Sequence, residues 1–275
     1  MFSKLSKLLV TFPLILILTS FQFNTNKSSH FSYGNFVGLS PSKIETLFSY
    51  DEIIIDASYY SKEQIKTLHD NNVKVYSYLN IGSLEKFRDY YDNFSNLIIE
   101  SYENWEDEGW IDVTNISFQN FILNDLSKSF IDKGIDGFFI DNMDVYSIKA
   151  NEATFNSLTY MLKELNSKYN KPIIINNGYD YVEEALRLNI DIRELFYGMN
   201  KESVFTSYDF EKNKPIKNSK EETDFLLQYL NNMSHNGINI YIIEYSKSKS
   251  FTKKLHNYYE NTSYSVYVSP RISLD

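Results

Sequence analysis

The chain has 275 residues, of which 43% are apolar and none is cysteine, so it is neither a disordered chain nor a protein held by disulfides, and it offers no thiol nucleophile. Its formal charge is −9 at pH 7, and an acidic surface argues against a nucleic-acid partner. The length suits one α/β barrel of roughly 250 residues better than two small domains.

The first 26 residues are predicted to be a targeting segment rather than part of the fold. Lys4 and Lys7 are their only charged residues, and an apolar run at 8–23 follows. This run is shorter than the ~20 residues of a comfortable membrane span, which favours a secretory signal. No small-residue cleavage site is clear, so an uncleaved N-terminal anchor is the alternative. We therefore expect a secreted protein, or one that touches a membrane only through that segment, at its outer face.

After a polar linker at 27–32, the domain predicted for 33–275 alternates strand-like and helix-like segments. Eight apolar runs are predicted strands, at 35–39, 52–56, 74–80, 137–141, 172–176, 195–200, 239–244 and 264–268. Apolar residues spaced by three and four predict helix faces at 118–130, 155–169 and 225–233. This alternation predicts a single (β/α)8 barrel of the TIM type. An open, doubly wound sheet is less favoured because no glycine-rich phosphate loop follows the first strand.

The connection at 82–110 is too long for a plain crossover. It carries Arg88 and several aromatic residues, namely Tyr90, Tyr91, Tyr102, Trp105 and Trp110. Long functional loops lie on the catalytic face of a barrel, where aromatic residues suit a carbohydrate cleft. A lid that only packs on the barrel is an equally good interpretation of any one of these residues.

Polar side chains follow seven of the eight predicted strands. In a barrel these strand ends share one rim, so the side chains would line a common cup. The residues are Asp56, Asn80, Asp141, Asn142, Asn176, Asn200, Glu202, Glu244, Tyr245 and Arg271. Any one of them could serve a turn, but repeated carboxylates at buried strand ends favour a functional site.

The residues by themselves leave two chemistries open. All four histidines lie in the linker, a helix or a helix end, which disfavours a Ser-His-Asp triad and a histidine-ligated zinc. A site of carboxylates can be the acid/base pair of a glycosidase. It can also be an oxygen-ligated Ca²⁺ or Mg²⁺ site.

Several motifs, in order, resemble glycoside hydrolase family 114, the endo-α-1,4-polygalactosaminidases. The most specific is Asp-Gly-Phe-Phe-Ile-Asp-Asn-Met-Asp at 136–144, and Asn-Lys-Glu-Ser at 200–203 is moderately specific. The segments 78–88, 110–114, 243–246 and 267–271 also fit, so the resemblance runs from about Phe31 to the end. It implies a glycosidase that cleaves α-1,4-linked, partly deacetylated galactosamine polymers of biofilm matrices.

The resemblance assigns the catalytic carboxylates to Asp141 and Glu202 and implies no metal or other cofactor. Ser83 stands where the family often has an acid, and Lys201 where a neutral residue is common. Because a deacetylated polymer is cationic, acidic residues are expected to bind its amines: Asp56, Asp144 and Glu244. Aromatic residues are expected to stack on sugars or bond through their hydroxyls: Tyr59, Tyr78, Tyr179 and Tyr245. The remaining expected contacts are Asn80, Asn142, Asn176, Asn200 and Arg271.

We expect Asp141 to stay ionised as the nucleophile and Glu202 to hold a proton as the acid/base, with Lys201 pointing away from the site. A carboxyl separation of about 5–6 Å, the spacing of a retaining enzyme, is expected across the rim. The competing functions are a catalytically silent, sugar-binding barrel at the cell surface and a carboxylate-metal hydrolase.

Overall fold

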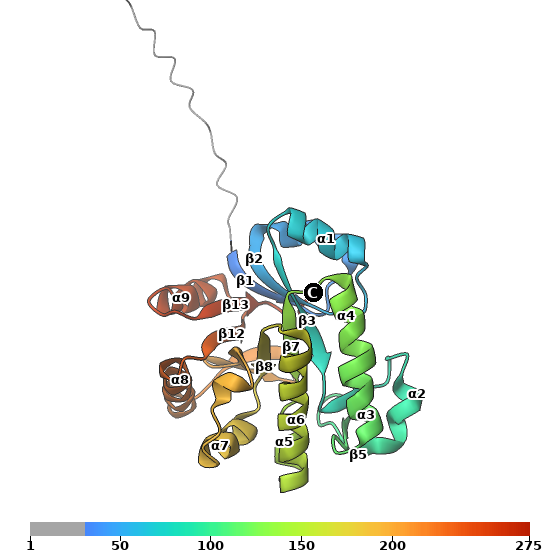
Figure 1. Cartoon of the computed structure of the whole chain (residues 1–275). Helices are drawn as coiled ribbons and strands as arrows, with labels where there is room; N and C mark the ends of the chain where they lie inside the picture. Colours follow the sequence, from blue (N-terminus) through green and yellow to red (C-terminus); the bar gives the residue numbers. More distant parts are fainter. Residues whose placement is uncertain (1–30) are drawn as a thin grey trace, which may run out of the picture.

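The computed structural model describes residues 31–275, so the predicted targeting segment lies outside the described residues. Eight parallel strands form a nearly closed barrel with helices around it, which confirms the predicted fold class (Figure 1). In spatial order the strands are Phe31–Phe36 (β1), Tyr50–Ile55 (β2), Lys74–Asn80 (β3), Gly137–Asp141 (β7), Ile173–Asn176 (β8), Gly198–Glu202 (β9), Asn239–Tyr245 (β12) and Ser265–Ser269 (β13).

Two strands lie a few residues away from their predicted positions. β1 begins at Phe31, inside the predicted linker, and the chain turns at Val37 and Gly38 rather than continuing as a strand. β9 begins at Gly198 because Leu195 still belongs to the turn that follows a short 3-10 helix, Ile192–Glu194 (η4). The later start of β9 places Glu202 at the end of the strand itself.

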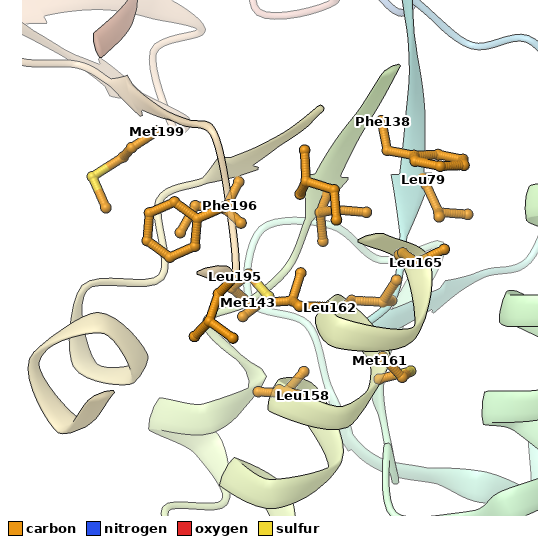
Figure 2. Close-up of a cluster of buried hydrophobic side chains, with 14 of the residues drawn as sticks. Leu79, Phe138, Met143, Leu158, Met161, Leu162, Leu165, Leu195, Phe196 and Met199 are labelled. Atoms are coloured by element: carbon orange, nitrogen blue, oxygen red, sulfur yellow. The ribbon is translucent and has the colours of Figure 1, made fainter. Parts of the chain in front are cut away.

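The two faces of the barrel strands have separate cores. Inside the barrel, aromatic and β-branched side chains form one cluster: Tyr33, Ile54, Tyr76, Phe139, Ile174 and Tyr241. The alternate residues of the same strands, such as Ile140 and Ile175, face the helices in a larger cluster. Figure 2 shows part of that outer layer, where Phe138 and Leu79 of the strands lie near Leu162 and Leu165. Burial on both faces is what near-continuous apolar strands require.

The helices surround the barrel (Figure 1). They are Pro41–Ser49 (η1), Lys62–Asp70 (α1), Tyr91–Phe94 (α2), Ser95–Leu97 (η2), Ile116–Asn120 (α3), Phe121–Leu126 (η3), Ser127–Lys133 (α4), Val145–Ile148 (α5), Glu152–Tyr169 (α6), Tyr179–Arg187 (α7), Lys220–His235 (α8) and Lys249–Tyr259 (α9). In α6 the side chain of Asn151 caps the first turn, and Asn170 ends the helix in a left-handed conformation. None of the helices within residues 31–275 is long and apolar enough to cross a membrane.

Two insertions rise from the carboxyl ends of the strands. The connection from β3 to β7 forms a small antiparallel sheet of Ser83–Glu85 (β4), Ile98–Ser101 (β5) and Glu108–Ile111 (β6). The connection from β9 to β12 forms a hairpin of Thr206–Asp209 (β10) and Lys214–Lys217 (β11). Trp105 of the first insertion and Phe210 of the second meet edge to face, with ring centroids 6.1 Å apart. The insertions therefore contact each other above the rim of the barrel.

Candidate active site

A cavity of about 800 Å³ lies at the carboxyl ends of the barrel strands. Nine residues predicted from the sequence line it: Asp56, Tyr59, Tyr78, Asp141, Asn142, Asp144, Asn176, Glu202 and Tyr245. The lining is strongly acidic, because it also includes Glu85 and Glu108 and its one cationic side chain is Arg88. Aromatic side chains from both insertions, among them Tyr102, Trp105, Tyr208 and Phe210, complete the lining.

Asn176 joins the two predicted catalytic carboxyls. Its Nδ2 donates to Oδ1 of Asp141 and to Oε1 of Glu202, each at 2.9 Å. Because one nitrogen reaches both oxygens, they lie at most about 5.8 Å apart, and about 5 Å apart when the two N–H bonds diverge by about 120°. The two carboxyls therefore form a close pair across one strand, β8.

The oxygens of the two carboxyls also differ in their other hydrogen-bond partners. Oε2 of Glu202 accepts a hydrogen bond of 2.6 Å from the Tyr245 hydroxyl. Oδ1 of Asp141 also accepts from the backbone N–H of Asn142 at 2.9 Å. Within residues 31–275, Oδ2 of Asp141 accepts no hydrogen bond, so its lone pairs are available to a ligand.

A buried chain of hydrogen bonds fixes the orientation of Asn176. Its Oδ1 accepts from Nδ2 of Asn200 at 2.6 Å, and Oδ1 of Asn200 accepts from the Tyr33 hydroxyl at 3.3 Å. With its oxygen occupied in this way, Asn176 must present its N–H groups to the carboxyls. Asn200 is fully buried and reaches the pair only through Asn176.

The chain turns sharply after each member of this group. The residues that follow Asp141, Asn176 and Glu202 all have positive φ angles: Asn142 at 63°, Asn177 at 53° and Ser203 at 64°. Asparagine adopts this left-handed conformation more readily than other residues with a Cβ, whereas a serine there costs roughly 1 kcal/mol. Three abrupt strand ends in adjacent strands thus direct three polar side chains to one place.

The pKa of Asp141 is raised to about 7, mainly by burial; the hydrogen bond from Asn176 lowers it in part, and the charges of Glu202 and Glu108 add to the rise. This differs from the expectation that Asp141 stays ionised in a polar setting, because the side chain lies deeper than its position at a strand end suggests. Asp141 therefore takes up and releases a proton near neutral pH.

Asp56 is already paired with a cation inside the protein. Nη1 of Arg88 lies 2.7 Å from Oδ2 of Asp56, and Nε of Arg88 lies 2.7 Å from Oε2 of Glu85. All three side chains are less than 10% exposed, at 7%, 5% and 8%. The Tyr78 hydroxyl donates to Oε1 of Glu85 at 3.1 Å. Asp56 thus shares its charge with Arg88 before any substrate amine arrives.

Glu108 is a third carboxylate beside the pair, and the sequence analysis did not identify it. Its Oε1 accepts hydrogen bonds from the Ser83 hydroxyl, from Asn80 at 3.2 Å and from Asn142 at 2.9 Å. Burial raises the pKa of Glu108. It comes from β6, far along the chain from the third barrel strand, yet it places an acid next to Ser83, where the family often has one.

The close approach of the chain before β4 to Asn142 requires Gly82. A Cβ at this position would lie 1.8 Å from the carbonyl oxygen of Asn142, so no side chain fits. This close approach lets the Ser83 hydroxyl accept from Nδ2 of Asn142 at 2.7 Å.

Residues 24–274 match the model of glycoside-hydrolase family GH114. The chain belongs to this family and is a glycosidase. Among solved structures it is similar to the glycoside hydrolase domain of PelA from Pseudomonas aeruginosa, at 16% identity and a TM-score of 0.75 over 90% of this chain and 96% of that one. Ega3 of Aspergillus fumigatus, solved with galactosamine, is 17% identical with a TM-score of 0.64 over 90% and 92%.

A more distant similarity links the GH114 barrel to AmyB, a maltogenic α-amylase from Thermotoga neapolitana. That match is 12% identical with a TM-score of 0.57, over 91% of this chain and 69% of the amylase. At these identities the structural matches show the fold alone. No curated protein sequence matches the chain significantly.

Four of the predicted contacts of this GH114 glycosidase do not line the cavity. Asn80 and Asn200 are buried beneath the lining and bond to residues that form it. Tyr179 begins α7 and packs against Tyr229 in a separate pocket, with ring centroids 4.9 Å apart. Arg271 pairs with Asp275 at 3.1 Å near the end of the chain.

Glu244, the fifth, is fully buried on the outer face of the barrel. Its Oε1 accepts from the Phe205 N–H at 2.8 Å and from the Tyr259 hydroxyl at 2.9 Å. Its Oε2 accepts from the N–H and the hydroxyl of Thr206, at 3.0 and 2.6 Å. Glu244 therefore holds the first residues of hairpin β10–β11 against the barrel and helix α9.

Lys201 also lies on the outer face, as the alternation of side chains along β9 predicts. Its ammonium donates to Oδ1 of Asn177 at 2.9 Å, and burial lowers the pKa of Lys201. No group of three or more histidine, aspartate or glutamate side chains within residues 31–275 is arranged to hold a metal ion.

Proposed function

We propose that this glycosidase cleaves α-1,4-linked galactosamine-containing exopolysaccharide outside the cell, by a retaining mechanism with Asp141 as nucleophile and Glu202 as acid/base. The observation that carries the mechanism is the shared donor. One amide nitrogen of Asn176 bonds to both carboxyls, which limits their nearest oxygens to about 5.8 Å. Retaining enzymes hold their carboxyls about 5–5.5 Å apart, whereas inverting enzymes need about 6.5–9.5 Å to admit a water.

The charge of the cavity supports a cationic substrate. Its lining holds six carboxyl side chains, Asp56, Glu85, Glu108, Asp141, Asp144 and Glu202, against the single guanidinium of Arg88. The amine of a deacetylated sugar carries a positive charge that such a cavity attracts. The structurally similar Ega3 was solved in complex with galactosamine, an amino sugar of this kind.

Aromatic side chains supply the second requirement of a sugar site. Tyr59 and Trp105 line the cavity and are 56% and 42% exposed, so their ring faces are available for stacking on pyranose rings. Tyr102 stacks on Trp110 with centroids 4.1 Å apart, and its hydroxyl donates to Oδ1 of Asn142 at 3.1 Å. The aromatic walls and acidic floor together suit an amino-sugar chain.

In the first step, Glu202 protonates the glycosidic oxygen as Oδ2 of Asp141 attacks the anomeric carbon. The leaving chain departs and a covalent glycosyl-enzyme forms with inverted configuration. In the second step, Glu202 takes a proton from water, which displaces Asp141 and restores the α configuration. A positive amine bound close to Asp141 favours the ionised form of that carboxyl, which is the form that attacks.

The proposed location follows from the substrate. Exopolysaccharide lies outside the cell, and the apolar segment at 8–23, preceded by Lys4 and Lys7, fits export. We propose that the protein is secreted, or held at the outer face of the cytoplasmic membrane if that segment is not cleaved.

The decisive experiment incubates the purified protein with galactosamine polymers of graded acetylation and with glucosamine polymers, and follows the first product by proton NMR. We expect shortened galactosamine chains whose new reducing ends are first seen as the α-anomer. If the β-anomer appears first, Asp141 activates water and the retaining mechanism is wrong.

Cleavage of glucosamine polymers alone would show that the proposed substrate is wrong, although the protein would still be a glycosidase. A chelator should leave the rate unchanged, unlike that of a metal-dependent hydrolase.

A further inference from the structure

A second cavity, of about 450 Å³, lies next to the active site. Residues of hairpin β10–β11, the loop after β12 and the first half of α9 line it. Tyr245 lines both cavities, so the two are neighbours, but the second contains neither catalytic carboxyl. We call it the lysine pocket, because four lysines line it: Lys214, Lys217, Lys247 and Lys254.

The lysine pocket has the opposite charge to the active-site cavity. No aspartate or glutamate is among its lining residues, although the whole chain carries a formal charge of −9. Three serines accompany the lysines: Ser246, Ser248 and Ser250. Four lysine side chains around one cavity give it a positive charge that attracts anions.

Two carboxylates lie close to the pocket without forming an ion pair with its lysines. Asp209 pairs with Lys212 at 3.0 Å, and the charge of Lys214, its neighbour on the paired strand, also lowers the pKa of Asp209. Glu244 beneath the pocket already accepts hydrogen bonds at both of its oxygens. In the part of the chain that the structure describes, Lys214, Lys247 and Lys254 form no ion pair, and the ammonium of Lys217 lies over the ring of Phe251 at 4.7 Å.

We propose that the lysine pocket binds the oxyanion groups, phosphate or carboxylate, of an acidic glycan chain. Lysine ammoniums bind such groups as point charges. The hydroxyls of Ser248 and Ser250 bond to each other at 3.2 Å, so one of the two can donate to a ligand. A concave site of this volume suits a small anionic sugar or polyol unit of a single chain. A cationic polysaccharide attracts polyanions and forms complexes with them. The active-site cavity would bind the cationic chain of such a complex, and the lysine pocket beside it would bind the anionic chain.

The test compares two double variants of the full-length protein with the same change of charge on the same stretch of chain. Lys247→Gln/Lys254→Gln alters the lysine pocket, whereas Lys249→Gln/Lys253→Gln alters exposed lysines of α9 that do not line it. Calorimetric titration uses inorganic phosphate, then a short poly(glycerol phosphate) and an oligogalacturonate. We expect the pocket variant to lower phosphate affinity at least about tenfold and the control variant less than about twofold.

At least one of the two oligomers should bind more tightly than inorganic phosphate, and the tighter one identifies phosphodiester or carboxylate as the natural group. Hydrolysis of a galactosamine polymer without added anion should be unchanged in the pocket variant. Any one of three results would overturn the proposal. The wild type could show no saturable binding of phosphate below about 10 mM. The two double variants could lose phosphate affinity equally, or the wild type could bind duplex DNA as tightly as either oligomer.

Discussion

The side chain of Asn176 holds Asp141 and Glu202 in place, because its amide nitrogen donates to both. A single donor between two carboxyls keeps them close while allowing one of them to be ionised. In the proposed mechanism each of the two carboxyls depends on the other for its function. Variants of the two residues should therefore not behave as independent changes.

We expect Asp141→Asn or Glu202→Gln alone to lower kcat by at least about a thousandfold, and the double variant to lose less than about tenfold more. The measurement is release of reducing ends from a galactosamine polymer. Glu183→Gln, an exposed carboxyl of α7, is the matched control and should keep wild-type activity. Cleavage near the wild-type rate by either single variant would show that other carboxyls do the chemistry.

Asp141→Asn should also make the protein more stable at neutral pH. The pKa of Asp141 is about 7 in the folded protein against an ordinary value of 3.8, so ionising it costs folding free energy that grows from pH 4 to 7 and is constant above. Asparagine removes that cost, and the free energy of unfolding should rise by about 2–4 kcal/mol at pH 8 but hardly change at pH 4. Urea unfolding at both pH values measures this, and a less stable variant at pH 8 would contradict it.

Among the structural elements, hairpin β10–β11 depends on one buried acid. Glu244 accepts all of its hydrogen bonds from the start of the hairpin and from α9, while Tyr208 and Phe210 of the same hairpin line the active-site cavity. An acceptor on the outer face of the barrel thus positions one wall of the cleft.

Glu244→Ala should leave several buried donors unpaired and lower the free energy of unfolding by about 3 kcal/mol. Because the hairpin wall loosens, KM for the polymer should rise more than kcat falls. Glu211→Ala, at the exposed tip of the same hairpin, is the control and should change neither quantity. An unchanged stability of Glu244→Ala would mean that the hairpin is held by other contacts.

The sequence predicted the barrel, and nine of the residues predicted for the site line the cavity, because both follow from local periodicity and strand ends. The alternation of side chains could also have placed Glu244: Tyr241, Ile243 and Tyr245 face inward, so Glu244 between the last two must face outward. Glu108 could not have been found in this way. It reaches the site through the antiparallel sheet of the first insertion. The periodicity of the sequence does not predict which strands of such a sheet pair with one another.

At the scale of the whole molecule, the proposed extracellular substrate requires that the protein be exported. We expect cell fractionation to find the protein in the medium or on the outer face of the cytoplasmic membrane. A version that lacks residues 1–26 should stay in the cytosol yet fold and cleave the polymer in a lysate, because the barrel begins at Phe31. A mainly cytosolic pool of the full-length chain would contradict this prediction.

The start of the first strand and the active-site cavity lie at opposite ends of the barrel. β1 begins at Phe31 at the amino ends of the parallel strands, whereas the active-site cavity lies at their carboxyl ends, on the opposite face. In a molecule tethered through the residues before Phe31, the amino ends of the strands would face the cell surface and the opening of the active-site cavity would face away from it. Attachment and catalysis would then take place at opposite poles, so polymer could reach the mouth without passing the tether.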